Sequence, residues 1–322
     1  MERALALPAP AKLNLFLHVI GRRADGYHDL QSAFALIDLA DWIDIEPRDD
    51  GELHRSGDLL GAPDDDLALR AARLLRERTG IGHGADIRVT KRIPAGAGLG
   101  GGSSDAATTL IALNRIWATA LPCDRLSEIA IELGADVPFF VRGFNAFAEG
   151  RGERLTPLAL QPAHYALIWP QVHVSTQEIF SDRGLTRNTK ATKMSDFSAA
   201  GDPGPWRGSE EGSEQARNDI ESGRGEVVAR VLARFGANDL EAVARRRFPV
   251  IGEVLEHLGR FGPARMTGSG SAAFAVVADE AEARDAVAGL PPGWCGWAVR
   301  GLAEHPLVAW QVHWSEVRTR IR

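Results

Sequence analysis

The feature that most constrains this 322-residue chain is a glycine-rich segment, PAGAGLGGGSSDAA, at residues 94–107. Alternating apolar residues over 85–90 predict a strand before it, and apolar residues at helical spacing over 106–117 predict a helix after it. Glycine lets the backbone approach a ligand closely, and a helix N-terminus presents free N–H groups and a positive dipole end. The segment is therefore typical of a phosphate-binding loop. The alternative is a flexible turn with an ordinary helix cap at Ser103 or Ser104.

Two other kinds of glycine loop fit less well. The chain contains no GxxxxGK[ST], so the loop lacks the lysine of the P-loop class. Gly96, Gly98 and Gly101 do fit the GxGxxG of dinucleotide-binding folds. In those folds the helix opens at the second glycine of the motif, whereas here the glycines continue to Gly102 and the predicted helix begins at the serines. The dinucleotide interpretation is therefore the weaker one.

Composition excludes several classes of function. The chain has 37 basic and 43 acidic side chains, a net charge of −6, so no broad positive field is available for a nucleic-acid partner. Cys123 and Cys295 lack CxxC spacing, and the nine histidines form no HExxH pair, so we expect neither disulfides nor a protein-held metal. No apolar run is long enough to span a bilayer. We therefore expect a soluble, cytoplasmic protein without a membrane partner, and make no prediction of its oligomeric state.

The hydrophobic pattern predicts a mixture of strands and helices. Alternation over 11–20 predicts a strand that places Lys12 and Asn14 on one face. The other predicted strands cover 40–46, 139–150, 164–169, 264–279 with a central glycine turn, and 294–300. The other predicted helices cover 67–78, 127–133, 226–235, 239–246, 250–260 and 280–288. Residues 181–216 are rich in Gly, Ser, Asp and Thr without apolar periodicity, which predicts a long mobile loop.

The glycine segment, read as PxGxGLGGGSSxAA, resembles the phosphate loop of the GHMP kinases, named for galactokinase, homoserine kinase, mevalonate kinase and phosphomevalonate kinase. Further segments resemble the branch of this family that acts on 4-diphosphocytidyl-2-C-methyl-D-erythritol. They are PAKLNLFL at 10–17, RRADGYHDLQS at 22–32, GADVPFF at 134–140, RNTK at 187–190, RND at 217–219 and TGSGSAAF at 267–274. Each motif is modest alone, but together they cover nearly the whole chain.

The resemblance implies a fold and a reaction. It implies a two-domain α+β protein, with a ribosomal protein S5 domain 2-like ATP-binding domain at 1–160 and a ferredoxin-like, substrate-side domain at 161–322. The active site would lie between the two domains. With ATP and Mg²⁺ as cofactors, the γ-phosphoryl group would pass to the 2-hydroxyl of the small-molecule substrate, a step of the non-mevalonate isoprenoid pathway.

The resemblance also implies catalytic roles for two residues. Asp136 matches the catalytic base, since phosphorylation of a hydroxyl needs a carboxylate within hydrogen-bond reach of the O–H. Lys12 matches an active-site lysine that keeps this carboxylate ionised and neutralises charge on the γ-phosphoryl oxygens. Without the resemblance, Asp136 is more typical of a turn or helix cap, and Lys12 of a solvated edge charge.

The implied ATP-binding residues form one set around the glycine loop. They are Lys91, Pro94, Gly96, Gly98, Leu99, Gly100, Gly101, Gly102, Ser103 and Ser104. One position departs from the family pattern, because Asp66 stands where the family often has asparagine. A carboxylate cannot donate a hydrogen bond to an adenine nitrogen, so an adenine contact at Asp66 is not expected, and Lys91 is the better-placed nucleotide contact.

The implied substrate-binding residues are Asn14, Tyr27, His28, Asp136, Thr176 and Phe180. Cytosine has a flat face and a polar edge, so Tyr27 would stack on it, His28 would contact its edge, and Phe180 would face Tyr27 across the base. Gln177, next to Thr176, replaces a proline of the family pattern. From the sequence alone, an exposed aromatic and an ordinary histidine in a turn are the alternative.

Two rival functions use the same fold. A GHMP kinase acting on homoserine, a mevalonate or a sugar would have no base to stack, so Tyr27, His28 and Phe180 argue against it. A non-catalytic nucleotide-binding protein would not need Asp136 and Lys12. An assay of ATP consumption with cytidyl and non-nucleotide alcohols separates all three, because fold alone does not determine function.

Overall fold

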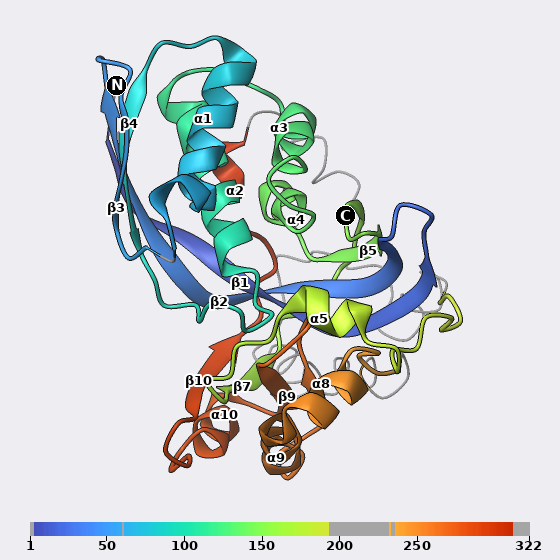
Figure 1. Cartoon of the computed structure of the whole chain (residues 1–322). Coiled ribbons are helices and arrows are strands. Elements are labelled where there is room, and N and C mark those ends of the chain that lie inside the picture. The colour runs from blue at the N-terminus through green and yellow to red at the C-terminus, as the bar shows by residue number, and fades with distance from the viewer. Residues whose placement is uncertain (1–2, 60, 193–231, 233–235, 312–322) are drawn as a thin grey trace, which may run out of the picture.

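A computed structural model describes the chain over residues 3–59, 61–192, 232 and 236–311 (Figure 1). The predicted helix at 226–235 lies, except for Leu232, outside the described residues. Most of the predicted loop at 181–216 also lies outside them. Its described part after α5, residues 182–192, contains no helix or strand.

The N-terminal unit is built on two long antiparallel strands, β1 (Ala4–Arg22) and β2 (His28–Arg48). They join a sheet of order β3-β4-β2-β5-β6 with β1 paired to β2. The remaining strands are β3 (Leu53–Gly57), β4 (Gly84–Thr90), β5 (Ala146–Gly150) and β6 (Arg154–Pro157). The predicted strands at 11–20 and 40–46 are thus confirmed as the inner parts of longer strands. Both faces of β1 and β2 are largely buried, so apolar residues there run together and hide the alternation.

Helices cover one face of this sheet (Figure 1). They are α1 (Leu67–Thr79), α2 (Gly101–Ile116), α3 (Cys123–Ala130) and α4 (Val137–Arg142), with the 3-10 turn η1 (Pro63–Asp65) before α1. Their apolar sides form one core with the sheet, including Leu75, Leu110 and Phe140. Asp66 caps α1, because its carboxylate accepts hydrogen bonds from the N–H groups of Ala68 at 3.0 Å and Leu69 at 3.1 Å.

The strand predicted at 139–150 is wrong over its first half, which forms helix α4. Pro138 lies in the first turn of α4, where its missing N–H costs nothing, and Gly143 ends the helix in the left-handed conformation with φ of 72°. Phe139 and Phe140 are fully buried in the helical layer. Their β propensity is therefore overridden by burial in this layer.

The C-terminal unit is an antiparallel four-stranded sheet of order β10-β7-β9-β8. Its elements are β7 (His164–Trp169), α5 (Thr176–Ser181), α8 (Glu241–Arg247), α9 (Pro249–Leu258), β8 (Ala264–Met266), β9 (Ala273–Val277), α10 (Glu280–Ala286) and β10 (Cys295–Arg300). The 3-10 turn η2 (Val308–Trp310) follows β10 and packs on the core of the first unit. With the strands numbered in chain order this is 4-1-3-2, the ferredoxin-like order. The ferredoxin-like prediction is confirmed for this unit.

A shared core joins the two units. It contains Leu13 from β1, Leu99 from the glycine segment, and Tyr165 and Phe274 from the second sheet. The chain passes from one sheet to the other between β6 and β7, and after β10 it returns to the first unit, where the His305 N–H donates to the Gly143 carbonyl at 2.8 Å. The domain boundary at 160/161 stays a prediction. Within the described ranges, none of the helices is long and apolar enough to cross a membrane.

Candidate active site

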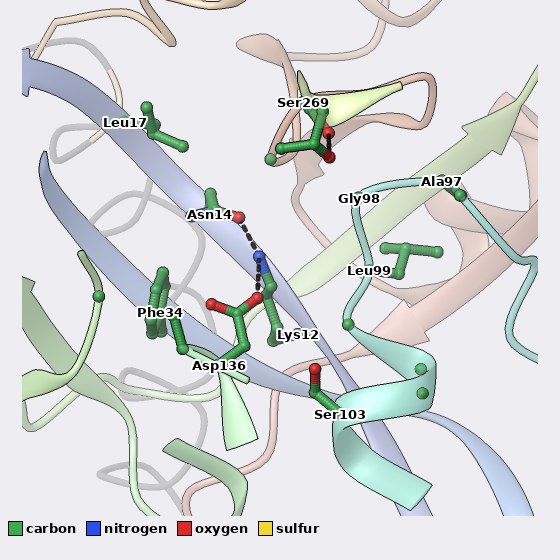
Figure 2. Close-up of a pocket in the computed structure, with 18 of the residues that line it drawn as sticks. Lys12, Asn14, Leu17, Phe34, Ala97, Gly98, Leu99, Ser103, Asp136 and Ser269 are labelled. Atoms are coloured by element: carbon green, nitrogen blue, oxygen red, sulfur yellow. Dashed lines mark hydrogen bonds and ion pairs between the residues drawn. The ribbon is translucent and has the colours of Figure 1, made fainter. Parts of the chain in front are cut away.

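Lys12 lies near the middle of β1 with its side chain turned toward Asp136 (Figure 2). Its ammonium is 3.5 Å from Asp136 Oδ2, donates to Asn14 Oδ1, and lies 5.1 Å from the centre of the Phe34 ring. The residue is only 4% exposed. A buried ammonium is unfavourable without partners, and this one has a carboxylate, an amide and an aromatic face.

Asp136 precedes α4 and makes no side-chain cap to it. Its side chain is 33% exposed, in contrast to 5% for the side chain of Lys12, so the carboxylate is open to the cavity on one side. Asn14, which also accepts a hydrogen bond from the Lys12 ammonium, is itself held by two hydrogen bonds. Its amide nitrogen donates to Ser32 Oγ at 2.8 Å, and its backbone N–H donates to Thr267 Oγ1 at 2.9 Å. The carboxylate is thus held beside a positioned cation and faces open space, as a proton acceptor requires.

The glycine loop leads directly into α2. Gly100 precedes the helix with φ of 74°, and the Lys12 N–H donates to the Leu99 carbonyl at 3.0 Å. A Cβ on Gly98, which has φ of 80°, would lie 2.2 Å from the Thr267 carbonyl oxygen. Only glycine fits where the loop touches the turn of the second unit. The loop backbone is therefore fixed between β1 and this turn.

The two serines of the loop have different positions. Ser103 lines the cavity and faces the same space as Lys12 and Asp136 (Figure 2). The Ser104 hydroxyl is fully buried and donates to the Pro10 carbonyl at 2.7 Å. The structure thus brings every predicted ATP-binding residue to the cavity wall except Ser104.

Lys91 reaches the cavity wall, but its ammonium is occupied. It donates to Asp105 Oδ2 at 2.6 Å and to Asp41 Oδ2. Asp41 Oδ1 in turn accepts from the N–H groups of Arg92 and Ile93, just before the glycine loop. The cluster Asp41–Lys91–Asp105 therefore joins β2, the entrance of the loop and the second turn of α2.

Burial and charge act in opposite directions in this cluster. Burial disfavours the charged form of Lys91, but the two carboxylates outweigh it and raise the pKa of the ammonium. Burial raises the pKa of Asp105 to about 7, with Lys91 opposing the rise and Asp41 adding to it. Two carboxylates around one ammonium leave one negative charge in excess. Protonation of Asp105, which its raised pKa favours, removes this excess charge.

Two cavities meet beside the Lys12–Asp136 pair. The first, of about 570 Å³, contains this pair, Asn14, Ser103 and the glycine loop. The second, of about 650 Å³, contains Tyr27, His28 and Arg187. Five residues line both cavities: Leu30, Ala135, Arg151, Thr176 and Phe180. The site therefore has room for two ligands that meet near Asp136.

The second cavity brings together the three predicted residues Tyr27, His28 and Phe180. Tyr27 is 52% exposed, and the guanidinium of Arg151 lies 3.8 Å from the centre of its ring. Phe180 stacks on His28, with ring centres 5.1 Å apart and planes at 26°. Tyr27 and Phe180 line the same cavity, and their opposition across a bound base stays a prediction. Thr176 Oγ1 is 2.8 Å from Ser269 Oγ, so α5 is also tied to the glycine turn of the second unit.

Four residues of the site were missed in the sequence. Phe34 and Ser269 line the first cavity, Arg187 the second, and Arg151 both. A signal was present for Arg151, which stands between Gly150 and Gly152, for Ser269, which lies in the TGSGS turn, and for Arg187, which opens the RNTK motif. Phe34 is one of the apolar residues of a buried strand and had no signal.

Comparison with known proteins then identifies the family. A model of the GHMP kinases N terminal domain matches residues 66–144, and a model of the GHMP kinases C terminal matches 216–292. The 4-diphosphocytidyl-2-C-methyl-D-erythritol kinase of Ralstonia nicotianae is 50% identical over 308 residues, which cover 95% of this chain and 96% of the relative. The chain belongs to this kinase family.

Solved structures agree with membership of the 4-diphosphocytidyl-2-C-methyl-D-erythritol kinase family. The crystal structure of a 4-(cytidine 5'-diphospho)-2C-methyl-D-erythritol kinase is 35% identical, covers 94% of this chain and all of its own, and has a TM-score of 0.69. A mevalonate kinase at 15% identity and a TM-score of 0.63 shares the fold alone. The resemblance found in the motifs and the predicted two-part α+β fold are thus confirmed.

Proposed function

We propose that this protein transfers the γ-phosphoryl group of ATP to the 2-hydroxyl of 4-diphosphocytidyl-2-C-methyl-D-erythritol, a step of the non-mevalonate isoprenoid pathway. The observation that carries the proposal is the meeting of the two cavities beside Lys12 and Asp136. The first cavity has a glycine loop at a helix N-terminus, which suits ATP phosphates. The second has aromatic rings and arginines, which suit a cytidine diphosphate.

In the proposed reaction Asp136 accepts the proton of the acceptor hydroxyl as its oxygen attacks the γ-phosphorus. The bond from the γ-phosphorus to the β,γ-bridging oxygen breaks, and ADP leaves with that oxygen. Lys12 stabilises the negative charge of the transferring group and orients the Asp136 carboxylate at 3.5 Å. Backbone N–H groups of the loop and of the first turn of α2 would hold the phosphates, so most of the catalysis is positioning and electrostatics.

The chemistry of the site suits a Mg²⁺ ion that arrives with the nucleotide. Within the described ranges no group of three His, Cys, Asp or Glu side chains could hold a metal ion. Mg²⁺ commonly keeps its waters and binds through phosphates and one or two protein oxygens. The Ser103 hydroxyl and the Asp136 carboxylate, which both line the first cavity, would supply these oxygens. When bound, the ion would neutralise phosphate charge.

The acceptor would lie across the junction of the cavities. Cytosine would stack on Tyr27 in the second cavity, with its polar edge at His28. Arg151, whose guanidinium caps Tyr27 and which lines both cavities, would meet the diphosphate. Thr176 and Asn14 would complete the path to Asp136. The cytoplasmic location and the exclusion of nucleic-acid and membrane partners stay predictions.

Release of ADP with different acceptors tests the proposal. We expect phosphorylation of 4-diphosphocytidyl-2-C-methyl-D-erythritol at a kcat/KM at least about 100-fold above that for homoserine, mevalonate or galactose, because these alcohols leave the second cavity unused. Turnover of a non-nucleotide alcohol at a similar kcat/KM would contradict the proposal in favour of another GHMP kinase. Nucleotide binding without turnover of any alcohol would favour a non-catalytic protein.

A further inference from the structure

Arg187 is the best-connected side chain of the second cavity, although it belongs to no helix or strand. Its Nε donates to His28 Nε2 at 3.1 Å. Its Nη1 donates to the Leu185 carbonyl at 3.1 Å, and its Nη2 donates to the carbonyls of Phe180 at 2.8 Å and Asp182 at 2.7 Å. One guanidinium therefore ties the C-terminal end of α5 to the beginning of β2.

The contact with His28 determines which ring nitrogen carries the proton. A guanidinium has donors and no acceptor, so His28 Nε2 must accept and cannot itself hold a proton. Protonation of the second nitrogen is disfavoured, because burial and the charges of Arg187 and Arg22 lower the pKa of His28. The ring is thus neutral with its single proton on Nδ1, which has no hydrogen-bond partner among the described residues.

We infer that Arg187 is a positioning residue that makes His28 a fixed hydrogen-bond donor and thereby selects cytosine over uracil in the second cavity. The inference rests on the proposed function, in which the acceptor carries a cytosine whose edge meets His28. Cytosine N3 is an acceptor, so it pairs with the Nδ1–H of His28. Uracil N3 carries a hydrogen, so its N3–H would face the Nδ1–H of His28. Two donors cannot form a hydrogen bond with each other, and both would be left unpaired.

The ring on which His28 stacks belongs to a residue that Arg187 also holds. His28 lies against Phe180 with ring planes at 26°, and Arg187 holds the carbonyl of the same Phe180. Stacking on Phe180 restricts the imidazole to one plane, and a half-turn within that plane would break the contact with Arg187. A histidine without such a partner could shift its proton and serve either base.

Binding of CDP and UDP by calorimetry tests the inference without any turnover. We expect the wild-type chain to bind CDP at least about 10-fold more tightly than UDP. In Arg187→Met the affinity for CDP should fall, and the CDP-to-UDP ratio should fall to within about 3-fold, because His28 is then free to change tautomer. A purely structural role for Arg187 would weaken both nucleotides by the same factor, and an unchanged ratio would overturn the inference.

Arg183→Met is the matched control. Arg183 is exposed in the same segment and has no hydrogen bond or ion pair with the described residues, so its loss should leave both affinities unchanged. Kinetics with cytidyl and uridyl acceptors give a second readout, in which Arg187→Met should raise KM for the cytidyl acceptor and leave kcat and the KM for ATP within about 3-fold.

The tautomer itself is observable in the wild-type chain, whether or not the variant folds. ¹⁵N chemical shifts of the His28 ring should show a protonated Nδ1 and an unprotonated Nε2. A protonated Nε2, or equal binding of CDP and UDP by the wild-type chain, would overturn the inference. Failure of the proposed function is separate, because it would appear as absent phosphorylation of the cytidyl acceptor while CDP is still preferred over UDP.

Discussion

At the scale of residues, the two lysines of the first cavity differ in the carboxylates that they contact. Lys12 and Lys91 are both buried lysines at the first cavity, but Lys12 contacts one carboxylate and Lys91 contacts two. Only Lys12 faces the open side of Asp136. These partners support the proposal that Lys12 serves phosphoryl transfer and that Lys91 supports the loop.

The raised pKa of Asp105 should make the free energy of unfolding depend on pH. Its pKa is raised from 3.8 to about 7, so between these values the folded chain holds a proton that the unfolded chain has released. This contribution to stability is complete below pH 3.8 and is lost as the pH rises through 7. Asparagine has no such titration. From pH 5 to pH 8 the free energy of unfolding of the wild type should therefore fall by about 2 kcal/mol relative to Asp105→Asn.

Urea unfolding of both proteins at pH 5 and pH 8 measures this difference. Asp285→Asn is the control, because Asp285 is also helical but exposed, and it should follow the wild type. The same change with pH in Asp105→Asn and in the wild type would show that Asp105 does not hold the proton.

At the scale of elements, we expect one added methyl group in the glycine loop to weaken both ATP binding and stability. In Gly98→Ala the new Cβ would lie 2.2 Å from the Thr267 carbonyl oxygen at a φ of 80°, so the loop or the facing turn must move. We expect the Kd for ATP to rise about 10-fold or more and the free energy of unfolding to fall by about 1 to 3 kcal/mol.

Gly82→Ala is the matched control for this experiment. A Cβ on Gly82 meets nothing within 4 Å, and its φ lies outside the left-handed region, so both quantities should stay near their wild-type values. Calorimetric titration of ATP and urea unfolding check both variants. Wild-type ATP affinity in Gly98→Ala would contradict the account of the loop.

Most elements could be predicted because local patterns and tertiary structure agree in them. The glycine loop, the helices at 67–78 and 250–260 and the strand at 164–169 are of this kind. Helix α4 was predicted as a strand because its buried phenylalanines are typical of strands, while its helical signals, Pro138 and Gly143, stand only five positions apart around a very short helix. Ser104 could not be separated from Ser103, because only the packing of α2 on β1 directs its hydroxyl to Pro10.

At the scale of the whole molecule, the site depends on two units meeting. The glycine loop and Asp136 come from the first unit, and the turn at 267–271 and α5 from the second, joined by the shared core. Arg151 and Arg187 likewise depend on contacts between segments that are distant in the sequence. They acquire their partners Tyr27 and His28 only when distant segments come together, so these contacts could not be predicted even though Arg187 opens the RNTK motif.

The central claim is that Lys12 and Asp136 act as one unit in phosphoryl transfer. Asp136→Asn keeps the shape but removes the charge and basicity, and Lys12→Met removes the neighbouring cation. Because each residue works through the other, their effects should not add, and the double variant should be little worse than the poorer single one. Asp124→Asn, at an exposed aspartate on α3, should leave kcat unchanged.

The most direct measurement is the steady-state kcat of Asp136→Asn with ATP and 4-diphosphocytidyl-2-C-methyl-D-erythritol. We expect kcat to fall by about 10² to 10⁴, toward the lower end if positioning outweighs proton removal, while both ligand affinities change much less. A near-normal kcat in Asp136→Asn, or losses that multiply fully in the double variant with Lys12→Met, would contradict the account.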